Sequence, residues 1–83
     1  MSEETSMFII EKKGNEEIRH VINEVYEALE ERGYNATNQI VGYLISGDPG
    51  YISSYKSARE KILTLDRTGI IEVLLTNFIQ NNK

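Results

Sequence analysis

Apolar residues recur at helical spacing through most of the chain, and no segment shows the strict alternation of a β-strand. Between residues 15 and 31 they fall every three or four positions, which predicts an amphipathic helix. Its apolar face contains Ile18, Val21, Ile22, Val25, Ala28 and Leu29. We expect Asn15 to cap this helix and Gly33 to end it in the left-handed conformation.

A shorter and denser apolar run follows. Residues 40–45 are nearly all apolar except Gly42, which predicts a short helix buried on more than one side. We expect Asn35 or Thr37 to cap this helix and Gly42 to let another helix approach closely. Two polar residues before the run are interpreted as helix-cap or dimer contacts rather than catalytic groups: Asn38 and Gln39.

A sharp turn after this run predicts a hairpin of helices similar to a helix-turn-helix. Gly47 fits the end of the second helix, Asp48 can cap the segment that follows, and Pro49 suits the first position of a new turn. The stretch is not a phosphate-binding loop, because the Gly-Lys-Ser/Thr sequence that such a loop requires does not follow.

Two further helices are predicted in the last third of the chain. Ser57 and Glu60 have the spacing of a capping box, so one helix should start at Ala58, with Ile62, Leu63 and Leu65 as its apolar positions. Thr68 should cap the last helix. The inner face of that helix is expected to contain Ile70, Ile71, Leu74, Leu75, Phe78 and Ile79.

Together these patterns predict an all-α fold, a compact bundle of about five short helices with a helix-turn-helix-like hairpin. Residues 1–14 are interpreted as a flexible regulatory N-terminal tail and residues 15–83 as the helical domain. A chain of 83 residues has a small core, and its apolar side chains exceed what that core needs. We therefore expect a homodimer that buries parts of the second and last helices.

The tail has two interpretations. Phe8 and Ile10 could dock loosely on the core of the domain. Alternatively, the hydroxyl groups of Thr5 and Ser6, in an acidic and accessible segment, could serve as substrates for a protein kinase.

Composition excludes several classes of protein. The chain has no cysteine and one histidine, His20, so neither a disulfide nor a metal site is expected, and no cofactor is implied. No nucleophile–base pair is visible, so we expect a binding or regulatory module rather than an enzyme. The net charge of −4 disfavours non-specific nucleic-acid binding. Neither a signal peptide nor a membrane-spanning run is visible, so we expect a cytoplasmic protein without membrane insertion.

The basic residues gather around one segment, which is the predicted partner-binding surface: Lys56, Arg59 and Lys61. Arg59 is expected to contribute to partner binding rather than folding, because Arg is enriched at interface hot spots. The alternative is a local ion pair of Arg59 with Glu60 or Asp66.

The central stretch resembles the IreB/ReoM family of small regulators from Gram-positive bacteria. The resemblance lies in Gly33-Tyr34-Asn35, Asn38-Gln39-Ile40-Val41-Gly42-Tyr43, Ser46-Gly47-Asp48-Pro49 and Tyr51-Ile52. We call the following residues the signature residues: Gly33, Asn38, Gln39, Gly42, Tyr43, Gly47, Asp48 and Pro49.

The resemblance implies a cytoplasmic all-helical homodimer that is a substrate of the PASTA-domain Ser/Thr kinase and its cognate phosphatase. It also implies a role in cell-envelope stress and cephalosporin resistance. In part of the family, the unphosphorylated form promotes Clp-dependent proteolysis of a peptidoglycan-precursor enzyme. Partners of that kind, a protease adaptor or a peptidoglycan-synthesis enzyme, are therefore expected here.

The resemblance assigns the phosphoacceptor to Thr5, with Ser6 as the local alternative. The segment departs from the family pattern at Ile10, where a second aromatic residue is usual. Two later segments also depart, Ser53-Ser54 in place of Pro-Arg and Asp66-Arg67-Thr68-Gly69 in place of Glu-Arg-Asp-Glu.

Phosphorylation could act in two ways. The phosphate could dock on the basic segment and mask it from a partner, which we favour, or it could repel the tail from the acidic first helix.

A different class, a helix-turn-helix transcription factor, is the alternative function. Its candidate recognition helix, residues 37–46, carries no Arg or Lys for contacts with bases or phosphates.

Overall fold

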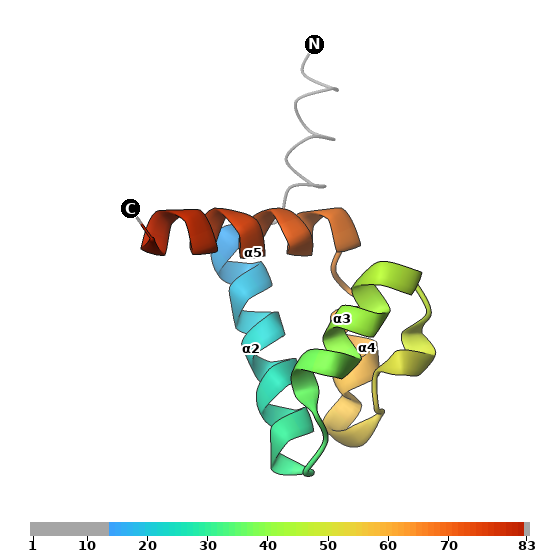
Figure 1. Ribbon diagram of the computed structural model, residues 1–83. Helices are drawn as coiled ribbons and strands as arrows, with labels where there is room; N and C mark the ends of the chain where they lie inside the picture. The colour runs from blue at the N-terminus through green and yellow to red at the C-terminus, as the bar shows by residue number, and fades with distance from the viewer. Residues whose placement is uncertain (1–13, 83) are drawn as a thin grey trace.

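The computed structural model describes residues 14–82, and this part of the chain is built from helices and turns without a strand. Figure 1 shows α2, α3 and α4 gathered on one side of α5, which lies across the N-terminal end of α2. The elements in chain order are α2 (Asn15–Glu31), α3 (Ala36–Ser46), the 3-10 turns η1 (Pro49–Tyr51) and η2 (Tyr55–Ser57), α4 (Ala58–Ile62) and α5 (Arg67–Asn81). The all-α prediction is confirmed, whereas the predicted tail lies outside the described residues except for Gly14.

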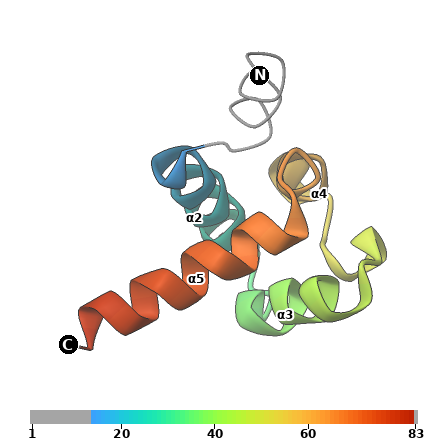
Figure 2. The same cartoon turned by 90° about the horizontal axis from the view of Figure 1, so that it is seen from above.

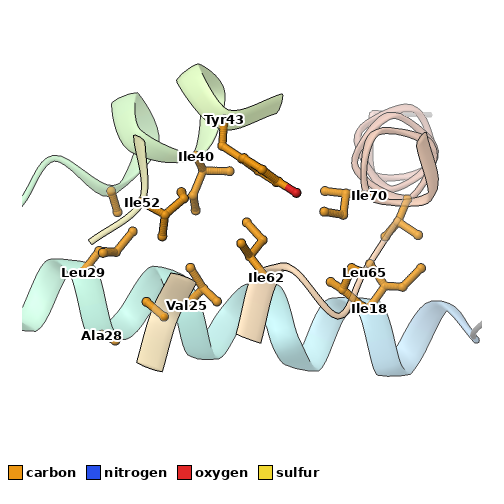
Figure 3. Close-up of a cluster of buried hydrophobic side chains, with 13 residues drawn as sticks. Ile18, Val25, Ala28, Leu29, Ile40, Tyr43, Ile52, Ile62, Leu65 and Ile70 are labelled. Atoms are coloured by element: carbon orange, nitrogen blue, oxygen red, sulfur yellow. The ribbon is translucent and has the colours of Figure 1, made fainter. Parts of the chain in front are cut away.

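One apolar core joins the four α-helices of residues 14–82 (Figure 3). Its largest fully buried side chains come from α2, α4, α5 and the loop after η1: Leu29, Ile52, Ile62, Ile70 and Val25. Each such side chain contributes about 1.5–3 kcal/mol relative to exposure. No polar or charged residue of the described part is buried. The stability of the domain therefore rests on aliphatic packing around Ile52 and Ile62.

The first helix begins one residue earlier than the capping prediction requires. Gly14, in extended backbone, is the N-cap, and its carbonyl accepts a hydrogen bond from the Ile18 N–H at 3.2 Å. Asn15 is therefore already helical, and the prediction that it caps α2 is wrong. The C-terminal prediction is confirmed, because Gly33 has φ of +91° and its N–H donates to the Glu30 carbonyl at 2.9 Å.

The predicted caps around α3 and the following turn are confirmed. The Asn35 side chain accepts a hydrogen bond from the Asn38 N–H at 3.0 Å, which selects Asn35 over Thr37 as the cap. Gly47 ends α3 with φ of +78°. The Asp48 carboxylate accepts from the Gly50 N–H at 2.8 Å at the start of η1.

Two expectations about the middle of α3 are wrong. The space beside Gly42 is filled by the Tyr51 ring and not by another helix, since an added Cβ would approach three ring atoms within 3.0 Å. The helix is also buried on one side only. Ile40 and Tyr43 are buried, whereas Ile45 is 79% exposed. The core thus covers one face of α3, and away from that face the Tyr51 ring covers only the position of Gly42.

The two later caps differ from the capping predictions. Ser57 is the residue before α4, but its side chain makes no capping hydrogen bond and its φ is +62°, so there is no capping box with Glu60. The cap of α5 is Asp66, whose carboxylate accepts from the Gly69 N–H at 3.1 Å. Thr68 is already helical because α5 begins at Arg67.

Helix α5 buries much less of its apolar face than predicted. Of the predicted inner residues only Ile70 is buried, together with Val73, which the prediction omitted. The other apolar residues of this helix are exposed: Ile71, Leu74, Leu75, Phe78 and Ile79. Leu63 near the end of α4 is also about half exposed, contrary to its predicted apolar role. In Figure 2, α5 extends away from the other helices toward its C-terminus, which explains this exposure.

Within residues 14–82, no helix is long and apolar enough to cross a membrane.

Candidate regulatory surface

The basic segment begins with a left-handed backbone conformation that the sequence did not predict. Lys56 and Ser57 have φ of +51° and +62°, two consecutive left-handed residues without a glycine. Such a conformation costs about 1–2 kcal/mol for each L-residue other than glycine. It turns the chain sharply from η2 into α4, so that Ala58 and Ile62 can enter the core.

An ion pair connects this turn to α2. Lys56 Nζ lies 2.8 Å from Glu31 Oε1, and both side chains are about half exposed. The hydrogen bond from Lys56 lowers the pKa of the Glu31 carboxyl, and the same bond raises the pKa of Lys56. Two cations lie near the Tyr55 ring, with Arg32 Cζ and Lys56 Nζ each 5.8 Å from its centroid. Solvent screens these contacts, so they orient the turn more than they stabilise it.

Arg59 contacts the backbone of the signature stretch. It is half-buried, and its Nε donates to the Ile52 carbonyl at 2.8 Å. Within residues 14–82 it forms no ion pair with Glu60 or Asp66, the local alternative. Arg59 thus holds the loop after η1 against α4, which gives it a folding contact beside the predicted partner-binding role.

Lys61 completes the basic segment and also faces α2. Its Nζ lies 3.9 Å from Glu24 Oε1, and that carboxylate is 3.5 Å from His20 Nε2 at its other oxygen. Lys56 and Lys61 therefore each pair with an acid of α2, at Glu31 and Glu24 respectively.

Three of the signature residues, Gln39, Gly42 and Pro49, contact the segment 51–53 that contains Ile52. Gln39 Oε1 accepts a hydrogen bond from the Ser53 N–H at 3.0 Å, a contact between α3 and the loop that the cap or dimer interpretation missed. Tyr43 is buried, and Gly42 accommodates the Tyr51 ring. Ile52 is fully buried, and its carbonyl accepts the hydrogen bond from Arg59. The segment 51–53 therefore helps to position the basic segment.

Arg67 is a contact that sequence reasoning did not identify. Its Nη1 donates to the Leu44 carbonyl at 3.0 Å, near the C-terminus of α3, and its guanidinium lies against Gly47. Basic groups favour helix C-termini because of the helix dipole. An arginine at the start of a predicted helix was visible in the sequence. Local spacing does not show, however, which other helix its side chain contacts.

The two predicted phosphorylation sites, Thr5 and Ser6, lie outside the described residues.

Within the described part, no group of three or more His, Cys, Asp or Glu residues is arranged to hold a metal ion. His20 is exposed, as predicted. Helix α3 carries no Arg or Lys, so the structure adds nothing in favour of DNA recognition.

These features define a small helical protein with a basic segment paired with acids and an exposed apolar face on its last helix. The model of the IreB regulatory phosphoprotein family matches residues 3–80 of the chain. The protein belongs to this family, and the match spans both the helical domain and the segment that contains Thr5 and Ser6.

Proposed function

We propose that the protein is a non-enzymatic cytoplasmic regulator switched by phosphorylation of Thr5, with Ser6 as the alternative acceptor. A PASTA-domain Ser/Thr kinase would add the phosphate and a cognate phosphatase would remove it. The regulated process is peptidoglycan homeostasis and cephalosporin resistance, through Clp-dependent proteolysis of a peptidoglycan-precursor enzyme. The family match over residues 3–80 carries this proposal, because it covers the tail and the domain together.

The proposed switch masks the basic segment. A phosphate adds roughly −1.5 to −2 charges and three strong acceptor oxygens. Lys56 and Lys61 face solvent-exposed carboxylates, and a dianionic phosphate forms stronger charge-assisted hydrogen bonds than a screened surface pair. Docking of the phosphorylated tail there would cover the surface that binds a protease adaptor or envelope enzyme. The helices themselves would keep their arrangement.

The proposed assembly is a homodimer formed through α3 and α5. Its support is the exposed apolar surface, with Ile45, Leu75 and Phe78 between 60% and 79% exposed. At about 100° per residue the exposed apolar residues of α5 lie on one face of that helix, and monomers rarely leave such a patch in water. Sedimentation at about 50 µM, well above the dissociation constant of a tight dimer, should give twice the chain mass. A monomer mass at that concentration would reject the dimer.

The function is tested by phosphorylating the protein with the kinase and mapping the modified residue by mass spectrometry. Amide NMR shifts of both forms should then differ around Arg59. A phosphate found only outside Thr5 and Ser6 would reject the switch. Shifts confined to α2, with Arg59 unchanged, would reject masking. Affinity capture with Thr5→Ala and Thr5→Glu baits then identifies partners that distinguish the two states.

A further inference from the structure

A groove runs between the first half of α2 and α5. It has a volume of about 260 Å³, and its lining includes apolar side chains from both helices, among them Ile18, Ile22, Ile70 and Leu74. Polar residues also line it, including Arg19 and Asn23 of α2 and Asn77 and Asn81 of α5. An apolar lining with polar groups around it suits a short amphipathic segment better than a flat protein surface.

Arg19 is the arginine whose side chain has no partner in the described part of the chain. Each of the other three makes a contact: Arg32 with the Tyr55 ring, Arg59 with the Ile52 carbonyl and Arg67 with the Leu44 carbonyl. Arg19 is exposed and lines the groove, without an ion pair to a carboxylate of residues 14–82. It therefore marks the groove for a ligand that carries negative charge.

The chain contains a segment of matching chemistry directly before α2. Residues 1–13 precede Gly14, and within them Glu11 directly follows the apolar run 7–10, Glu4 lies three residues before it, and Lys12 and Lys13 come after Glu11. Phe8 is six residues before Gly14, and an extended chain of that length spans up to about 20 Å. The helical rise from Asn15 to Asn23 is about 12 Å. The run can thus reach the groove while α2 stays intact.

The groove also differs from the proposed dimer surface. At about 100° per residue, Ile70, Asn77 and Asn81 lie on one side of α5, whereas Leu75 and Ile79 lie on another. Only Leu74, between the two sides, belongs to both. A segment in the groove therefore leaves most of the exposed apolar surface of α5 accessible to a second copy.

We propose that the apolar run 7–10 of the chain's own N-terminal segment docks in the groove between α2 and α5. Phe8 occupies the apolar part of the groove, and a flanking acid of the segment pairs with Arg19. Both helices contribute to the site, so docking links the N-terminal segment to the α2–α5 packing. The proposal concerns the unphosphorylated chain and does not depend on a kinase, so it can fail while the proposed function holds, and the reverse.

Paramagnetic relaxation tests this docking on the full chain. The sequence has no cysteine, so a single Ser6→Cys variant accepts one nitroxide label. The expected result is a selective loss of amide signal at Arg19, Asn23 and Asn77, with Ser53 and Lys56 unaffected. Uniform weak losses, or losses centred on residues 56–61, would overturn the proposal.

Two pairs of variants make the test specific. Adding Phe8→Ser should restore the lost signals, whereas Met7→Ser should leave most of the loss in place, because the proposal assigns the apolar part of the groove to Phe8. Arg19→Glu should likewise restore signal, while Arg32→Glu, at the residue that follows α2 and outside the groove, should not. Circular dichroism confirms that each variant stays helical. Equal effects within either pair would contradict the docking.

A mixing experiment separates the chain's own groove from that of a second copy. Isotope-labelled protein without a nitroxide is mixed with nitroxide-labelled protein at natural isotope abundance. The proposal expects no signal loss in the mixture, since each segment occupies its own groove. Loss at Arg19 and Asn77 in the mixture would place the segment on a partner copy and overturn the proposal.

Discussion

Replacing Gly42 by alanine should lower the free energy of unfolding. The same replacement should raise it in a protein whose Tyr51 side chain has also been removed. Gly42 lies inside α3, where alanine is normally the better helix former. An added Cβ would, however, lie within 3.0 Å of three atoms of the Tyr51 ring. The ring belongs to η1, whose position is fixed by Pro49 and the Asp48 cap. The substitution therefore sets helix propensity against packing of the turn.

The magnitudes favour packing. Tyr51 is 51% exposed, so about half of its surface is in contact with the protein. Half of the area that a buried aromatic residue removes from water is about 100 Å², worth about 2.5 kcal/mol at about 25 cal/mol per Å². Displacing the ring would lose most of this burial free energy, whereas the higher helix propensity of alanine over glycine would stabilise the fold by about 1 kcal/mol. We expect Gly42→Ala to lower the free energy of unfolding by about 1 kcal/mol.

A double-mutant cycle with Tyr51→Ala isolates the cause. Without the ring, Gly42→Ala should raise the free energy of unfolding by about 1 kcal/mol, because only the helix-propensity gain remains. Urea titrations followed by circular dichroism measure both steps at one protein concentration, which keeps any dimerisation term constant. Destabilisation of the same size with and without Tyr51 would refute the reasoning and point to another neighbour of Gly42.

Two further predictions concern the turn before α4. Ser57→Gly should raise the free energy of unfolding by about 0.5–1 kcal/mol, because glycine adopts the left-handed conformation without the side-chain penalty. Lys56→Gly, its matched control, should gain less in the same urea titration since it also removes the pair with Glu31. The pKa of Glu31 is lowered in the fold, so its pair stabilises above the ordinary value of 4.5 and is lost as pH falls through the lowered pKa. The stability difference between the unsubstituted protein and Glu31→Gln should thus be constant near neutrality and shrink in acid, and a difference that stays constant into acid would contradict this.

Local signals in the sequence sufficed for the central stretch because each cap there acts on residues two to four positions away. Asn35, Gly47 and Asp48 take the roles that their residue types favour. The cap of α5 was mispredicted because two suitable residues, Asp66 and Thr68, lie within three positions of each other. The backbone uses the earlier one, and α5 then starts at Arg67, whose side chain reaches α3.

Contacts between distant segments were less accessible to sequence reasoning. Apolar spacing assigned six residues to the inner face of α5, but spacing alone does not tell which apolar residues of a helix pack against the rest of the chain, and five of the six are exposed. Only Ile70 and Val73 pack inside this chain. The left-handed pair at Lys56 and Ser57 lacks the glycine that usually marks such a turn. The basic segment itself was found from composition, whereas its acidic partners on α2 required the fold.

Arg59 makes a hydrogen bond within the fold and is also predicted to bind a partner. The effect of replacing it must therefore be compared with that of a second variant that loses only the charge. Arg59→Ala removes the bond from Nε to the Ile52 carbonyl, and a half-buried hydrogen bond to a charged group contributes about 2 kcal/mol. In a domain of this size that loss should lower the melting temperature by roughly 10 °C. Lys61→Ala removes a nearby charge without such a bond, so its melting temperature should change little. If both variants lose affinity for a captured partner while only Arg59→Ala loses stability, charge on this surface serves binding and the bond to Ile52 serves folding. A strongly lowered melting temperature for Arg59→Ala with partner affinity intact would show that Arg59 acts in folding alone.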